Sequence, residues 1–108
     1  MPSIQLDGRQ LTDWNKFHDA CKTAFGFPDF YGRNMDAWID CLSGLRNDDG
    51  MSAYVLGEDE QLQIQILNSD VLRRDAPEIL SALEECTAEV NLLCSESGEK
   101  PALGLVLR

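Results

Sequence analysis

Segments in which hydrophobic and polar residues alternate predict the strands of this chain. The clearest alternation is Leu62–Leu67, and a shorter one at Ser3–Leu6 precedes the turn dipeptide Asp7-Gly8. The continuous apolar segment Ala102–Leu107 has the composition of a buried strand. Residues Ala53–Leu56 could add one further short strand. The pattern therefore predicts three strands and leaves a fourth open.

Between these strands, hydrophobic residues recur three or four positions apart, which is the spacing of one helix face. Thr12 can cap a first helix that stops before Gly26, and Asn34 can cap a second that ends at Gly44. Asp75 can cap a third, longer helix. The hydrophobic positions of the three helices are Trp14, Phe17, Cys21 and Ala24, then Met35, Trp38, Ile39 and Leu42, then Ile79, Leu83, Cys86, Val90 and Leu93. Because helices connect successive strands, this order predicts an α/β fold with a small parallel sheet.

Length and composition indicate one globular domain over residues 1–108. Hydrophobic residues make up 44% and charged residues 26% of the positions, a balance typical of a folded chain with its own core. No apolar segment approaches the roughly 20 residues that cross a bilayer, and the start of the chain lacks the basic and apolar regions of a signal peptide. We therefore expect a cytoplasmic protein that does not insert into a membrane.

The formal net charge is −10, and the excess of acidic residues lies in two segments. Residues 29–60 carry eight acidic and two basic side chains, and residues 84–99 carry five acidic side chains and no basic one. The two segments are either separate solvated surfaces or, if the fold brings them together, one acidic patch. Such a chain is a poor binder of nucleic acid or of an anionic membrane, so we expect its partner to be basic.

Candidate catalytic and metal-binding residues are few. The four cysteines, Cys21, Cys41, Cys86 and Cys94, form no CxxC pair, and the only histidine, His18, lies one helical turn before Cys21. A metal site at these two residues is conceivable, but free thiols in a reducing compartment are the simpler interpretation. The sequence has no P-loop and no GxGxxG, GxSxG or Cys/His nucleophile signature. We therefore expect neither an enzyme nor a cofactor-binding protein.

The second predicted helix separates its acidic residues from its hydrophobic ones. At about 100° per residue, Asp36, Asp40 and Ser43 fall on one side of it. The helix dipole favours Asp36 in the first turn, whereas Asp40 repels Asp36 at a cost of about 0.2–0.5 kcal/mol. A sequence tuned only for stability would more naturally place a basic residue at position 40, which is a weak indication that the carboxylates serve an external target. Paired carboxylates could also serve acid–base catalysis, but nothing near them supplies a second catalytic group. Ahead of the helix, Phe30 and Tyr31 crowd a short loop and could supply aromatic binding anchors.

The loop and the second helix also carry a recognisable motif. The string FPDFYGRNMDAWIDCLSG, Phe27–Gly44, resembles the signature of the barstar family, named after the intracellular inhibitor of the ribonuclease barnase. The strand, turn and first helix align with the family without gaps, so the resemblance covers about the first 45 residues. Beyond them only the order of elements matches, and this chain is longer than barstar around residues 46–62 and 91–101.

The resemblance implies a compact α/β domain with a three-stranded parallel sheet packed with helices. It also implies a mechanism in which the second helix and the loop before it occlude the active site of a ribonuclease. The key aspartate of the family falls at Asp40 and its companion at Asp36. The other positions that we assign to partner binding are Phe30, Tyr31, Ile39, Ser43, Gly44 and, across alignment gaps, Glu85.

Several positions depart from the family pattern. Barstar has tyrosine at the position of Phe30, tryptophan at those of Ile39 and Leu45, and glutamate at that of Arg33, which leaves the identity of the ribonuclease open. We expect a non-enzymatic bacterial ribonuclease inhibitor of the immunity or antitoxin type, monomeric when free. The alternatives are an adaptor that binds a basic partner other than a nuclease, and a small enzyme or metal protein that uses the paired aspartates and His18.

Overall fold

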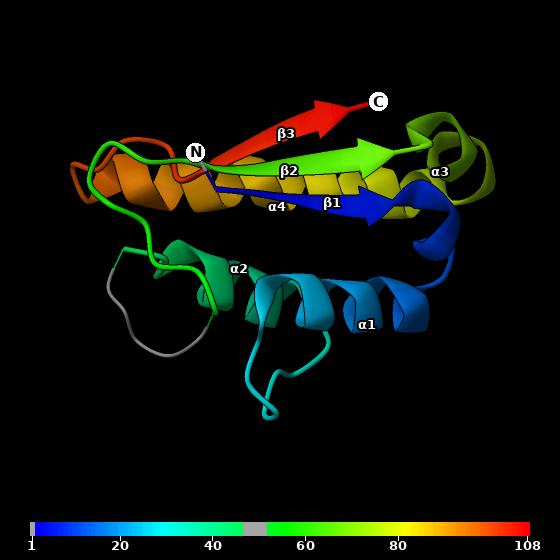
Figure 1. The fold of residues 1–108 in the computed structure, drawn as a ribbon, viewed down its shortest axis with the longest axis horizontal. Helices are drawn as coiled ribbons and strands as arrows, with labels where there is room; N and C mark the ends of the chain where they lie inside the picture. The colour runs from blue at the N-terminus through cyan, green and yellow to red at the C-terminus, as the bar shows by residue number, and fades with distance from the viewer. Residues whose placement is uncertain (1, 47–51) are drawn as a thin grey trace.

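The computed structural model describes residues 2–46 and 52–108 of the chain (Figure 1). Its strands are β1 (Ser3–Asp7), β2 (Leu62–Leu67) and β3 (Leu103–Leu107). They form one parallel sheet in the order β1-β2-β3. The sequence therefore predicted the fold class and the three-stranded parallel sheet correctly.

The helices occupy the connections between the strands. A short 3-10 helix (Gly8–Gln10), α1 (Trp14–Phe25) and α2 (Met35–Ser43) follow β1, whereas α3 (Ser69–Asp75) and α4 (Pro77–Glu96) follow β2. Figure 1 shows α1, α2 and α4 running opposite to the strands, with α4 behind the sheet and α1 and α2 along the side of β1. None of the helices in the described part of the chain has the length and apolarity that crossing a membrane requires.

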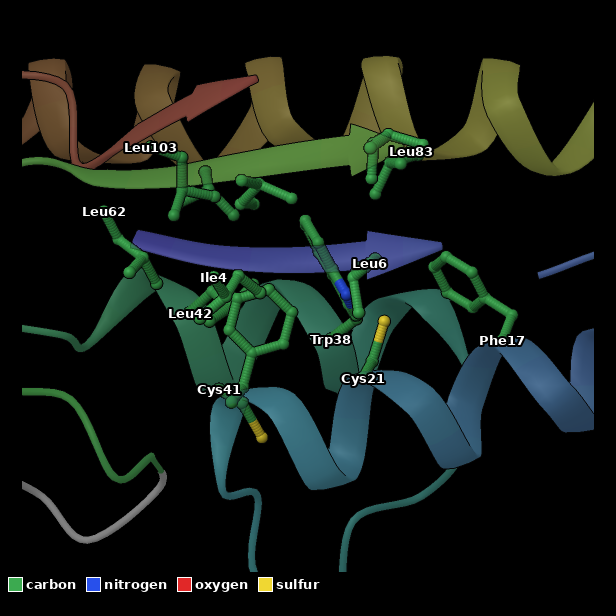
Figure 2. Close-up of a cluster of buried hydrophobic side chains, with 14 of the residues drawn as sticks. Ile4, Leu6, Phe17, Cys21, Trp38, Cys41, Leu42, Leu62, Leu83 and Leu103 are labelled. Atoms are coloured by element: carbon green, nitrogen blue, oxygen red, sulfur yellow. The ribbon is translucent and has the colours of Figure 1, made fainter. Parts of the chain in front are cut away.

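The core lies between the sheet and the helices. Along β2, the side chains of Leu62, Ile64 and Ile66 are buried, while the side chains between them are half-buried, so the alternation in the sequence corresponds to two unlike faces of the sheet. Figure 2 shows side chains of α1 and α2, including Cys21 and Trp38, gathered next to β1. Removal of these apolar side chains from water, at about 25 cal/mol per Å², is the main force that holds the layers together.

The ends of the first two helices follow local rules. Asn34 caps α2 as predicted, because its Oδ1 accepts a hydrogen bond from the Ala37 amide at 2.8 Å. For α1 the predicted cap Thr12 is wrong by one residue: Asp13 Oδ1 accepts from the Lys16 amide at 2.9 Å. Both residue types cap helices well, so the sequence could not distinguish two adjacent candidates.

The predicted cap of the long helix is also wrong. Asp75 is the last residue of α3, where its carboxylate accepts from Arg74 Nε at 2.9 Å. The residue that precedes α4 is Ala76, which has an extended φ of −146° and no capping side chain. Ala76 is fully buried, so packing between the two helices sets this boundary. Pro77 needs no amide partner as the first residue of α4.

The optional fourth strand at Ala53–Leu56 does not form. The Ala53 amide donates to the Phe25 carbonyl at the end of α1, and the Leu56 amide donates to the Leu45 carbonyl beyond α2, each at 2.9 Å. These backbone groups therefore bond to the helix ends and not to a neighbouring strand. Leu56 is nonetheless buried, which explains the strand-like hydrophobic pattern of the segment.

Arg46 joins two connections that are distant in the sequence. Its guanidinium donates from Nε to the Gly57 carbonyl at 3.1 Å and from Nη1 to the Lys100 carbonyl at 2.7 Å. Nη2 donates to the carbonyls of Glu60 at 3.0 Å and Pro101 at 3.4 Å. The chain that leaves α2 is thus held against the connection between α4 and β3.

Candidate functional site: an acidic face on two parallel helices

The N-terminal cap and the buried side of α2 fix which way its carboxylates point. Asn34 caps the helix, and Trp38 and Leu42 are fully buried on its inner side. Asp36 in the first turn and Asp40 one turn later lie on the outer side, and both side chains are exposed. The arrangement predicted from the rotation of about 100° per residue is therefore present.

The helix α4 packs against α2 and runs in the same direction (Figure 1). Near the start of α2, the charge of Asp36 acts on the Cys86 thiol of α4. At the end of α2, Ser43 lines one surface depression together with Leu93 and Glu96 of α4. The acid-rich segments 29–60 and 84–99 therefore meet in space through these two helices, as the second of the two sequence interpretations requires.

Cys86 marks the place where carboxylates from both helices come together. Partial burial raises the pKa of its thiol, and the nearby charges of Glu85, Asp36 and Glu89 raise this pKa further. All three carboxylates are exposed. Together with Asp40 they form what we call the acidic face: Asp36 and Asp40 of α2, with Glu85 and Glu89 of α4.

Sequence reasoning assigned Glu85 to the site but missed Glu89. The signal was available, because Glu89 lies four positions after Glu85 and shares its side of a helix. Using that signal required knowing that α4 lies beside α2, and the hydrophobic pattern of a single helix does not say which neighbour it packs against.

The carboxylates of the acidic face are not among the acidic groups that form ion pairs in the described part of the chain. Five acidic side chains there do pair with basic ones, and these pairs are Asp7 with Arg9, Asp19 with Arg33, Asp29 with Lys22, Asp59 with Lys100 and Asp75 with Arg74. Within residues 2–46 and 52–108, none of the four carboxylates of the acidic face forms an ion pair. Their negative potential is therefore available to a cationic molecule from outside.

The loop before α2 places its aromatic residues Phe30 and Tyr31 differently. Phe30 is 75% exposed, and the loop projects beyond the helices on the side away from the sheet (Figure 1). Tyr31, which we expected among the partner contacts, is only 6% exposed. Its hydroxyl lies 2.7 Å from His18 Nδ1, and burial raises the pKa of the phenol above its ordinary value of 10. In this structure Tyr31 supports the loop from inside, and Phe30 provides the exposed ring.

The remaining predicted contact residues lie at the border of the acidic face. Ile39 and Ser43 are half-buried, and Ser43 Oγ donates to the Asp40 carbonyl at 3.2 Å. Gly44 ends α2 and is buried. The exposed members of the predicted set are thus Phe30, Asp36, Asp40 and Glu85.

The thiols and the histidine occupy the interior. None of the four cysteines forms a disulfide: Cys86 is half-buried, and Cys21, Cys41 and Cys94 are buried. Burial raises the pKa of Cys21 to about 12. Burial also lowers the pKa of His18 below 6.5, and the charge of Arg33 lowers it further. Among the residues that the structure describes, no three His, Cys, Asp or Glu side chains are placed to hold a metal ion. What the acidic face and the loop beside it offer chemically is a set of carboxylates and the exposed ring of Phe30, which suits the binding of cationic groups.

The fold and the acidic face define a small α/β domain with an exposed group of carboxylates on two adjacent helices. A family model described as barstar, the barnase inhibitor, matches residues 1–106. The chain therefore belongs to the barstar family. Over 44 residues it is also 48% identical to a protein of Bacillus subtilis (strain 168) that bears the name "Putative ribonuclease inhibitor YrdF". That stretch is 41% of this chain and 48% of the relative, so the match spans about half of the relative's length.

Proposed function

We propose that this protein is a non-enzymatic inhibitor of a bacterial ribonuclease. The observation that carries the proposal is the exposed acidic face, which has no internal counter-charge, on a chain of the barstar family. The net charge of −10 supports it, as does the similarity over 44 residues to a protein named as a ribonuclease inhibitor. The coarse function follows from family membership, and the residue roles below are our own assignment.

The physical basis is mimicry of charge. A ribonuclease binds a phosphodiester and stabilises the negative charge that develops on it, so its active site presents cationic groups. Carboxylates of the acidic face would occupy the phosphate positions and accept charge-assisted hydrogen bonds from those groups. Phe30 would add an apolar anchor beside them, and Ile39, Ser43 and Gly44 would close the contact at the end of α2. RNA would then be excluded because the inhibitor fills its place.

The proposed partner is a basic ribonuclease, either the host's own enzyme or a toxin domain delivered by a competing cell. In the second case the protein acts as an immunity protein or antitoxin. We propose that it acts in the bacterial cytoplasm, is a monomer when free, needs no cofactor and does not itself contact nucleic acid or membrane. Long-range attraction between the acidic face and the cationic site would speed their encounter.

An inhibition assay with matched charge variants tests the proposal. The enzymes are barnase, the ribonuclease that the family description names, and any ribonuclease encoded beside this protein's gene. The readout is cleavage of a fluorogenic RNA. The test variant is Asp40→Asn with Glu89→Gln, and the matched control is Asp70→Asn with Glu78→Gln on α3 and the first turn of α4. Both double variants change the net charge by the same amount, and only the first alters the acidic face.

We expect the control to inhibit like the parent protein and the test variant to lose inhibition. Equal inhibition by both variants would show that overall charge, and not the acidic face, matters. If no ribonuclease is inhibited, and the protein purified from its native cells carries a basic partner that does not cleave RNA, the adaptor alternative replaces this proposal.

A further inference from the structure

The loop that carries Phe30 runs back along α1 and contacts it at successive points. Asp29 Oδ1 lies 3.5 Å from Lys22 Nζ, and the Tyr31 hydroxyl lies 2.7 Å from His18 Nδ1. Positions 22 and 18 are about one helical turn apart, so both contacts fall on the same side of α1. The loop therefore follows α1 from its C-terminal end toward its N-terminal end.

Arg33 makes the most extensive of these contacts. Its Nη1 donates to Asp19 Oδ1 at 2.7 Å, and its Nη2 donates to the Asn15 carbonyl at 3.1 Å. A guanidinium is a rigid planar fork, so two acceptors on successive turns of α1 fix both its position and its orientation. A lysine at this position would present a single, freely rotating ammonium and could not be held in the same way.

The backbone of Arg33 indicates that this contact resists a local strain. Its φ is +54°, in the left-handed region that residues other than glycine, asparagine and aspartate seldom adopt. Such a conformation persists only where the surrounding contacts impose it. The next residue is Asn34, the cap of α2, so the strained turn directs the chain into the helix that carries Asp36 and Asp40.

We infer that Arg33, Asp19 and Asn15 form a clasp that holds Phe30 and the start of α2 in place before a partner arrives. Arg33 is thus a positioning residue, whose side chain acts through the loop. The consequence for binding rests on the proposed function, whereas the ordering of the loop is a property of the free protein. Exposed ion pairs contribute little to overall stability, so the effect of the clasp should be local.

The test compares Arg33→Asn with Arg73→Asn. Asparagine tolerates a positive φ, so Arg33→Asn removes the guanidinium and leaves the backbone conformation accessible. Arg73→Asn makes the same change on α3 and is the charge-matched control. The first measurement is 15N relaxation of the free proteins. We expect the order parameters of the Phe30 and Tyr31 amides to fall from about 0.85 to below about 0.6 in Arg33→Asn only. Melting temperatures should stay within a few degrees of the parent in both variants.

The second measurement is affinity for barnase, used as the ribonuclease probe. Ordering a loop at the moment of binding should weaken the Arg33→Asn complex about 3- to 10-fold and leave Arg73→Asn unchanged. Asp19→Ala removes one of the two acceptors of Arg33 and leaves the Asn15 carbonyl, so it should reproduce part of the loss. The double variant of Asp19 and Arg33 should lose no more than Arg33→Asn alone, because that variant already lacks the Asp19 contact.

Several results would overturn the inference. Unchanged order parameters in Arg33→Asn would show that the clasp does not hold the loop, and an equal change in Arg73→Asn would assign the effect to net charge. Disorder without loss of affinity would refute the positioning role, and a general loss of order with a large fall in melting temperature would make Arg33 an ordinary stabilising residue. If the parent protein does not bind barnase, the affinity measurement counts against that partner in the proposed function. The relaxation comparison on the free proteins then decides whether the clasp exists.

Discussion

Replacing Asp40 by asparagine separates the two roles that an exposed carboxylate on α2 can have. The side chain is exposed, lies one turn after Asp36, and pairs with no basic side chain in the described part of the chain. It therefore contributes to solubility, to partner binding, or to both. Asparagine keeps the shape of the side chain and removes its charge, so the substitution tests the charge alone.

The effect on stability should be small and favourable. Aspartate and asparagine have similar helix propensities, so the main change is relief of the repulsion between Asp40 and Asp36, about 0.2–0.5 kcal/mol. In a domain of roughly this size, 1 kcal/mol shifts the melting temperature by about 4–8 °C. The melting temperature of Asp40→Asn should therefore rise by about 1–4 °C.

The effect on binding should be large and opposite in sign. Removing one partner of a buried charge pair at an interface leaves the cationic groups opposite without a counter-charge, which costs about 2–5 kcal/mol, a range that draws on barnase–barstar itself and so is not independent support. At a factor of ten per 1.4 kcal/mol, the expected loss is roughly 30-fold to several thousand-fold in affinity.

Titration calorimetry against the inhibited ribonuclease and melting curves of the free variants measure the two effects separately. Asp70→Asn on α3 is the matched control, because it removes an exposed carboxylate away from the acidic face. Binding of Asp40→Asn with the affinity of the parent protein would refute the reasoning. It would leave Asp40 as a solvated residue and remove the centre of the proposed site.

Three further predictions concern charge, thiols and pH. The association rate with the ribonuclease, measured by stopped flow, should fall steeply from low to physiological salt while the dissociation rate changes less; a flat association rate would contradict steering by the acidic face. Single replacements of the cysteines by alanine or serine should leave inhibition intact and alter stability through packing alone, with the largest change at the fully buried Cys21. Loss of inhibition in a folded double variant of Cys86 and Cys94 would instead indicate metal or redox chemistry. Burial holds the pKa of His18 in the folded protein below 6.5, its ordinary value in the unfolded chain. At a pH between these two pKa values the unfolded chain therefore binds more protons than the folded one. Stability in urea titrations should therefore fall as the pH is lowered from 7 to 5, with a smaller fall in His18→Asn; identical pH profiles would exclude His18 as the cause.

The elements of the fold were predictable where the sequence pattern has one physical cause. Leu62–Leu67 alternates because one side of β2 faces the helices and the other side does not. Boundaries set by tertiary packing were not predictable, since the start of α4 depends on the burial of Ala76 between two helices. The segment Ala53–Leu56 resembled a strand because Leu56 is buried, but its backbone bonds go to helix ends.

The candidate site divides in the same way. The geometry of one helix places Asp36 and Asp40 together, so they could be found from their spacing alone. Glu89 required knowing which helix lies beside α2. In an irregular loop no periodicity shows which ring faces the core, so the different burial of Phe30 and Tyr31 could not be read from the residues. A chain that turns back along α1 brings Arg33 to Asp19, and only the folded structure shows this return.

The parallel register of the sheet has a consequence for protein synthesis. Ser3 pairs opposite Gln63, and Leu62 pairs opposite Leu103. The strands β1 and β2 therefore each pair with a strand that leaves the ribosome much later. Contacts of such high contact order form late, because the entropy of closing a long loop is lost before the pairing is gained. The nascent chain can form α1 and α2 early, whereas α4, which carries Glu85 and Glu89, packs against both α2 and β3 and has all of its contacts only when β3 completes the sheet. We therefore expect a translating ribosome to release a binding-competent inhibitor only after Leu103–Leu107 has emerged, so that a cell making the ribonuclease and this protein together depends on the relative timing of their translation.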